Sequence, residues 1–139
     1  MEKKLVDWAE KYSIGSEEID NQHKNILSLI NKLYLSFTEG KADDVIEDIL
    51  NEMVQYTDYH FKTEESYFEK FNYSDYSTHI EEHLFFINQV LNFRDDFKKE
   101  SITITYDIMN FLRDWLIKHI QGSDKKYMNE FKSKEINDL

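Results

Sequence analysis

The chain contains no proline and only 3 glycines among its 139 residues, although average usage would place about seven prolines in such a length. This scarcity of helix-breaking residues predicts long helices joined by short connections. Four segments repeat apolar residues with the period of an amphipathic helix. They run from Ile19 to Phe37, from about Asp43 to Phe71, from Tyr76 to Phe97 and from Ile108 to His119. The pattern predicts an all-α fold, an antiparallel up-down-up-down four-helix bundle.

The breaks between these segments contain residues that end or begin helices. Gly40 is a natural residue for the position after a helix end, and residues 72–75 (Asn-Tyr-Ser-Asp) interrupt the second segment. In the third connection, Ser101 or Thr103 is a plausible N-cap. We expect one domain over residues 1–139, with an extended N-terminal segment at 1–15, the bundle at 16–122 and a C-terminal tail at 123–139.

The two ends of the chain carry aromatic and apolar residues of their own. Trp8 and Tyr12 in the N-terminal segment are expected to cap the bundle. The tail is expected to form a short amphipathic helix packed on the outside of the bundle, through Tyr127, Met128 and Phe131.

Composition excludes several classes of protein. A net charge of −11 disfavours nucleic acid and anionic membrane surfaces as partners. With no cysteine, disulfides, thiolate zinc sites and iron–sulfur clusters are impossible. The N-terminus has no apolar signal-peptide core, and no stretch approaches about 18 uncharged apolar residues. We therefore expect a cytoplasmic protein without membrane insertion.

All 5 histidines occupy positions suited to a metal ligand. His60 and Glu64 are four residues apart, which places them on one helix face. His79 and His83 form a second pair with the same spacing. Asp124 follows His119 by five residues and supplies another carboxylate. The full candidate set is His23, His60, Glu64, His79, His83, His119 and Asp124. The histidines fall within the apolar stripes, and an unpartnered polar group buried there costs about 1–3 kcal/mol.

The positions of these residues along the helices predict one shared site. At 1.5 Å per residue, all seven lie near the same end of the bundle, and every helix supplies at least one. Seven ligands are too many for one tetrahedral zinc ion but suit two adjacent ions bridged by carboxylates. Among redox-active metals, imidazole and carboxylate ligands suit iron best, with manganese and zinc behind.

The spacing of His119 and Asp124 needs a departure from the regular helix. Five residues advance an α-helix by about 140° from the starting direction, so both side chains cannot point inward. We therefore predict a local distortion or a helix end that Gly122 and Ser123 permit.

These motifs resemble the hemerythrins, in particular the bacterial branch. The resemblance runs from about Trp8 to Tyr127 and includes the stretches at residues 14–24, 60–65, 79–83 and 115–127. It implies dioxygen as ligand and a non-haem di-iron centre in a four-helix bundle. By the resemblance, one iron is bound by His79, His83 and His119, the other by His23 and His60, and Glu64 and Asp124 bridge the ions together with an oxo or hydroxo group.

The resemblance also implies an apolar dioxygen pocket around the iron that has only two histidines. Its expected residues are Ile26, Phe61, Trp115, Leu116 and Ile120. One departure is Phe68, where family members commonly have methionine, and we expect it to change packing without loss of the site. Asp20, Asp58, Glu65 and the tyrosines could hydrogen-bond the ligand imidazoles, but the sequence does not select among them.

We expect the protein to bind dioxygen reversibly, for oxygen carriage, storage or delivery, and not to act as an enzyme. A five-histidine site holds less negative charge than a glutamate-dominated one, which favours the diferrous state. One alternative is a di-iron enzyme acting on peroxide or nitric oxide, although no sixth histidine is present to serve as acid or base. Another is an oxygen-sensing module acting through a separate partner. A redox or oxygen-consuming protein could also be a partner.

Overall fold

The computed structural model describes residues 4–41, 43–99 and 106–136, and within them every regular element is helical. The long helices are α1 (Glu17–Thr38), α2 (Asp43–Phe71), α3 (Tyr76–Lys98) and α4 (Tyr106–His119). A short 3₁₀ turn (Glu10–Tyr12) precedes them, and a π-helical turn (Ile120–Asp124) and α5 (Lys125–Ser133) follow. The all-α prediction is confirmed.

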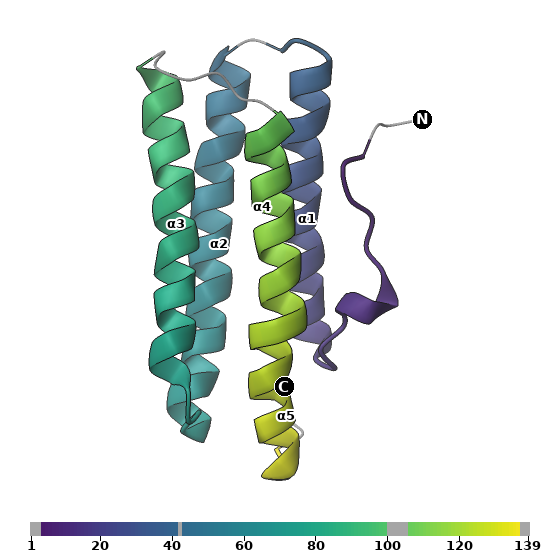
Figure 1. The fold of residues 1–139 in the computed structure, drawn as a ribbon, viewed down its shortest axis with the longest axis vertical. Coiled ribbons are helices and arrows are strands. Elements are labelled where there is room, and N and C mark those ends of the chain that lie inside the picture. The colour runs from purple at the N-terminus through teal and green to yellow at the C-terminus, as the bar shows by residue number, and fades with distance from the viewer. Residues whose placement is uncertain (1–3, 42, 100–105, 137–139) are drawn as a thin grey trace.

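The four long helices form an antiparallel bundle. In Figure 1, α1 and α3 run upward, α2 and α4 run downward, and α5 continues α4 at the lower end. α1 packs against α2, α2 packs against α3, and α4 returns to contact α1. Aromatic rings also join α3 to α4, with the centroids of Phe86 and Trp115 4.6 Å apart. This is the predicted up-down-up-down arrangement.

Local chemistry fixes both ends of α1. At its start, the side chain of Ser16 accepts a hydrogen bond from the backbone N–H of Ile19. At its end, Gly40 adopts a φ of 64°, which glycine tolerates without steric strain. The N–H of Gly40 donates to the carbonyl of Phe37, and the N–H of residue 41 donates to that of residue 36. This pair of bonds defines a Schellman motif, so the predicted helix stop is confirmed. The N-cap predicted at Ser101 or Thr103 lies outside the described residues.

The N-terminal segment lies along α1 (Figure 1). The Asn31 side chain accepts hydrogen bonds from the N–H groups of Leu5 and Val6 and donates to the carbonyl of Val6. Trp8 and Tyr12 meet edge to face, with ring centroids 5.8 Å apart, and Tyr12 is buried. These contacts hold the segment against the outside of α1.

The expectation that the tail packs on the outside of the bundle is wrong. Tyr127 and Phe131 of α5 are fully buried. Their rings pack against residues near the end of α2, with Tyr127 4.9 Å from Phe68 and Phe131 5.4 Å from Phe71 between centroids. Because the π-turn leaves α5 as a continuation of α4, the apolar face of α5 covers the lower end of the bundle.

The interior changes character along the bundle axis. The end with the 39–42 connection is filled by apolar side chains, including those of Leu33, Leu50, Val90 and Met109. Towards the other end the buried side chains include five imidazoles and two carboxylates. Among the described residues, no helix has the length and apolar character needed to cross a bilayer.

Candidate metal centre

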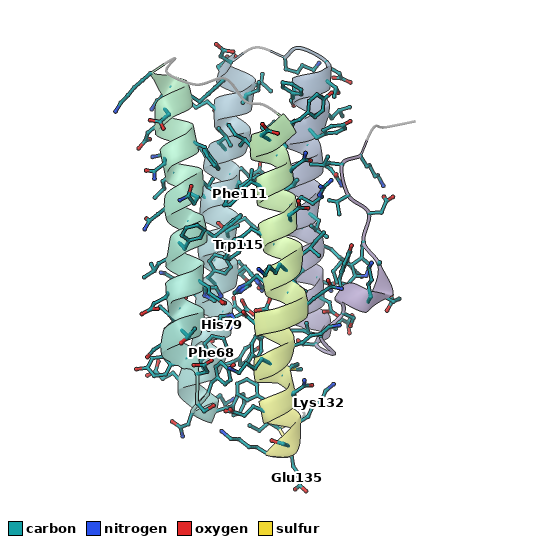
Figure 2. All side chains as sticks on the ribbon, in the orientation of Figure 1. Phe68, His79, Phe111, Trp115, Lys132 and Glu135 are labelled. Atoms are coloured by element: carbon teal, nitrogen blue, oxygen red, sulfur yellow. The ribbon has the colours of Figure 1, made fainter. Side chains whose placement is uncertain are left out.

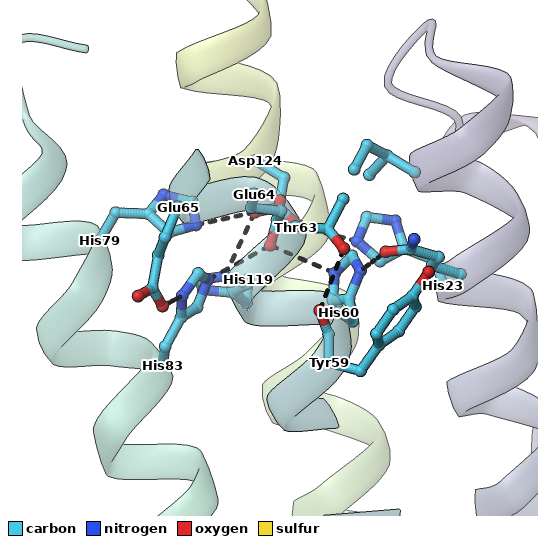
Figure 3. A network of polar contacts seen from close by, with 12 residues as sticks. His23, Tyr59, His60, Thr63, Glu64, Glu65, His79, His83, His119 and Asp124 are labelled. Carbon is cyan, nitrogen blue, oxygen red and sulfur yellow. Dashed lines mark hydrogen bonds and ion pairs between the residues drawn. The ribbon is translucent and has the colours of Figure 1, made fainter. Parts of the chain in front are cut away.

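The seven candidate residues converge between the helices, and every long helix contributes at least one of them (Figure 3). α1 contributes His23, α2 contributes His60 and Glu64, α3 contributes two histidines and α4 contributes His119. Asp124 comes from the last position of the π-turn. All seven side chains are buried, with exposures between 0% and 5%. The predicted convergence is therefore present in the structure.

Their ligand atoms fall into two groups that share both carboxylates. The three-histidine group contains His79, His83 and His119 with Glu64 and Asp124, and the two-histidine group contains His23 and His60 with the same two carboxylates. Within each group the ligand atoms all lie within 4.8 Å of one another. Two metal ions sharing two carboxylates would require this pattern.

Short distances join the imidazoles to Asp124. Its Oδ1 lies 3.0 Å from His79 Nε2 and 3.2 Å from His119 Nε2, and its Oδ2 lies 3.0 Å from His23 Nε2. Glu64 has the same relation to the remaining histidines. Its Oε1 lies 3.2 Å from His60 Nε2 and 3.3 Å from His83 Nε2.

None of these contacts satisfies the atoms as a hydrogen bond. All five Nε2 atoms and all four carboxylate oxygens of Glu64 and Asp124 are buried without a hydrogen-bond partner. Two ligands at about 2.1 Å from one ion, held at right angles, lie about 3.0 Å apart. The spacing therefore matches ligands that face a common ion, and the nitrogen–oxygen donor set suits a di-iron centre.

The π-turn brings Asp124 to the same site as His119. Within it the N–H of Lys125 donates to the carbonyl of Ile120, five residues earlier, which is the hydrogen bond of a π-helix. A wider turn returns the fifth residue towards the face of the first, so the predicted distortion is confirmed. Gly122 is not its cause, because a Cβ there would contact nothing within 4 Å and its φ is not positive.

Three polar side chains approach the outer Nδ1 atoms of the histidines. His60 Nδ1 donates to Gln22 Oε1 at 2.6 Å, and His83 Nδ1 donates to Glu65 Oε2 at 3.0 Å. His119 Nδ1 lies 3.1 Å from Glu82 Oε2. Such contacts orient the rings so that Nε2 faces the site.

Of the carboxylates considered from sequence, only Glu65 lies in this position. Asp20 instead accepts hydrogen bonds from the Ser13 hydroxyl and the Ile14 N–H, and Asp58 pairs with Lys62 on the surface. Neither Gln22 nor Glu82 was predicted from the sequence. A signal existed for Gln22, because it lies on the apolar stripe three residues after Ile19.

The imidazoles and carboxylates of the cluster shift one another's pKa values. Burial alone would raise the pKa values of Glu64 and Asp124, but the surrounding imidazoles hold both below their ordinary values. Burial opposes protonation of His119, yet Asp124 and Glu82 raise its pKa to about 10. For His60, burial dominates and lowers the pKa. The lowered pKa values favour the ionised, metal-binding form of both carboxylates, and the raised pKa of His119 means that a metal ion there would compete with a proton.

Aromatic rings enclose the imidazoles. Phe61 stacks on His83 with centroids 3.9 Å apart, and Trp115 stacks on His119 at 4.7 Å. Figure 2 shows Trp115 and His79 projecting into the bundle from α4 and α3. Three further residues of the expected pocket, Ile26, Leu116 and Ile120, are fully buried, whereas Trp115 is partly buried.

Two more aromatic residues lie beside the imidazoles. Phe68 lies edge to face with His79 at 4.8 Å, so it packs directly beside the site. The Tyr127 ring lies 5.5 Å from His79, and its buried hydroxyl has a pKa raised by burial. Tyr127 was predicted to lie in the tail, and its position beside His79 was not predicted.

Comparison with known proteins agrees with this geometry. Residues 14–131 match the family model of the hemerythrin HHE cation binding domain. The chain is 32% identical to a hemerythrin-like protein of Naegleria gruberi over 121 residues, covering 87% of this chain and 89% of that protein. It is also 32% identical to a bacteriohemerythrin of Stenotrophomonas maltophilia over 129 residues, covering 93% and 83%.

A solved structure gives the same result in three dimensions. The crystal structure of a wild-type hemerythrin superposes with a TM-score of 0.81 at 29% identity, covering 90% of this chain and 96% of the other. The residues matched by the family model include all seven converging side chains. The chain belongs to the hemerythrin family.

Proposed function

We propose that this protein binds dioxygen reversibly at a carboxylate-bridged di-iron centre and serves to carry, store or deliver oxygen. One observation carries the proposal: two groups of buried, unpartnered ligand atoms share Glu64 and Asp124. Membership of the hemerythrin family supports it, because proteins of this family generally bind oxygen and are not enzymes.

The proposed ligands follow from the two groups. His79, His83 and His119 would hold one iron, and His23 and His60 would hold the other. Glu64 and Asp124 would bridge the two ions, with a solvent-derived oxo or hydroxo group as a third bridge. Ionised carboxylates also offset part of the charge of the two cations, which an apolar bundle interior could not do.

The unequal number of histidines would leave one coordination position free. The two-histidine group offers one imidazole fewer while sharing the same carboxylates, so the vacancy belongs to its ion, and dioxygen would bind there. When bound, two ferrous ions supply the two electrons that dioxygen takes up on binding and returns on release.

The surrounding side chains would protect this reaction from water. We propose that Phe61, Ile26, Leu116 and Ile120 form a dry wall beside the vacancy, since all four are buried and none can titrate. Trp115 stacks on His119, so we propose that it shields the three-histidine side. Without an acid or base in this wall, protonation that would drive irreversible oxidation is disfavoured.

The test is a cycle of loading and oxygenation. The metal-free protein is loaded anaerobically with ferrous iron, iron content is measured, and absorption spectra are recorded under air and then under argon. We expect two irons per chain and visible charge-transfer bands that appear and vanish reversibly.

A matched pair of variants connects the bands to the site. His60→Ala removes a proposed ligand and should abolish reversible bands, whereas Tyr59→Ala, at an exposed neighbouring position, should keep them. Irreversible bleaching or turnover of peroxide would favour an enzyme instead. Failure to bind two irons would remove the basis of the proposal.

A further inference from the structure

The outer nitrogens of the histidines have different partners in the two groups. In the three-histidine group, His83 Nδ1 donates to the Glu65 carboxylate at 3.0 Å, and His119 Nδ1 lies 3.1 Å from the Glu82 carboxylate. Two of its three imidazoles therefore face a negatively charged group on the side away from the site.

Among the residues that the structure describes, neither imidazole of the two-histidine group has a carboxylate at its Nδ1. His60 Nδ1 donates to the neutral amide oxygen of Gln22 at 2.6 Å. His23 Nδ1 is buried without a hydrogen-bond partner in the part of the chain that the structure describes. Hydrogen bonding is thus present on both sides, but negative charge lies behind only one.

This difference has an electronic consequence for a bound metal. An imidazole that donates Nδ1–H to a carboxylate becomes a more basic ligand, and negative charge close to an ion stabilises its higher oxidation state. A neutral amide orients the ring without adding charge. The partners of the outer nitrogens can therefore set different redox properties for two ions that share the same bridges.

We infer that Glu65, Glu82 and Gln22 make the centre electronically asymmetric, so that the three-histidine ion is oxidised more readily and the two-histidine ion is held ferrous. This inference rests on the proposed function. Glu65 and Glu82 are 31% and 38% exposed, so solvent reduces the effect of each without removing it.

Isosteric substitutions separate charge from positioning. Glu65→Gln keeps an oxygen that accepts from His83 Nδ1–H, and Glu82→Gln keeps an oxygen beside His119 Nδ1, but both changes remove the charge. Gln22→Glu instead adds a charge behind His60. Redox titration of the iron-loaded proteins gives both midpoint potentials, and Mössbauer spectra assign each step to an ion. Each Glu→Gln change should raise the ferrous-to-ferric ratio of the three-histidine ion about tenfold at fixed potential, about 59 mV for one electron. Gln22→Glu should lower that ratio at the two-histidine ion by a similar factor.

Neighbouring surface positions provide controls. Glu69→Gln on α2 and Glu81→Gln on α3 remove a charge from exposed residues beside the same helix segments and should leave both potentials unchanged. Zinc binding, which involves no redox change, should give two ions per chain in every variant and so report an intact site.

Each outcome decides a different statement. If the wild-type protein does not bind two ions, the proposed function and this inference both fail. If every variant binds two ions but the Gln variants keep wild-type potentials, only the asymmetry is wrong. If Glu82→Ala shifts the potentials and Glu82→Gln does not, Glu82 only positions the ring of His119, and the inference is overturned.

Discussion

Around Leu33, Leu50 and Met109 the bundle interior consists of apolar side chains, whereas around Glu64 and Asp124 it contains buried imidazoles and carboxylates. The helices and their antiparallel packing are the same in both regions. The apolar region gains stability directly by removing side chains from water. The polar region contains nine buried ligand atoms on two carboxylates and five imidazoles that have no hydrogen-bond partner.

This contrast indicates that the two halves of the bundle are stabilised in different ways. The apolar half should be stable whether or not metal is present. The half with the metal site should depend on metal, because binding free energy there is also folding free energy. Four measurements test this difference between the two halves.

Metal removal should have the largest effect. With free metal about 1,000-fold above its dissociation constant, binding stabilises the folded state by about 4 kcal/mol. We expect chelation to lower the free energy of unfolding by at least this amount. Hydrogen exchange should accelerate most in the first turns of α1 and α3, next to His23 and His79, and least around Leu50. Equal acceleration along the whole bundle would contradict a division into two halves.

Leu50→Ala tests the apolar half. Removing a fully buried leucine side chain costs about 2–5 kcal/mol, and Leu50 is 0% exposed. Denaturant titration should give the same loss in the metal-loaded and metal-free proteins, because Leu50 is far from the metal site along α2. A loss that changes with metal content would show that the two regions are coupled.

Gln22→Ala tests the polar half without touching a proposed ligand. The change leaves His60 Nδ1 buried without its acceptor, which costs about 1–3 kcal/mol. Metal affinity should fall about 10- to 100-fold, as measured by competition with a chelator. An unchanged affinity would mean that packing alone orients the His60 ring.

Gly40→Ala should give the smallest effect, at the end of the apolar half. Gly40 has a φ of 64°, and a residue with a Cβ is less stable in this conformation by about 1 kcal/mol. The free energy of unfolding should fall by this amount, and metal affinity should not change. The control is Gly122→Ala, whose φ is not positive and whose added Cβ would contact nothing within 4 Å. Thermal unfolding of both variants makes the comparison, and an equal loss in the two would contradict this explanation.

Periodicity and spacing were enough to predict the helices and the seven converging residues. A residue such as His60 lies on an apolar stripe, so its inward direction follows from the helical period. Glu82 could not be found this way, because its contact with His119 joins α3 to α4 and depends on how those two helices pack. Tyr127 was misplaced for a related reason, since its burial requires α5 to continue the α4 axis.

The four helices, their order and the residues facing inward could be predicted from the sequence, because helical period and chain connectivity are local properties. The sequence also indicated that His119 and Asp124 need a distorted turn, since a regular helix would direct them apart. The folded structure was needed to show that this turn is π-helical, that α5 closes the lower end of the bundle, and which groups lie behind the imidazoles of His60, His83 and His119. Those features depend on distances between helices, and side-chain packing across the interior sets these distances.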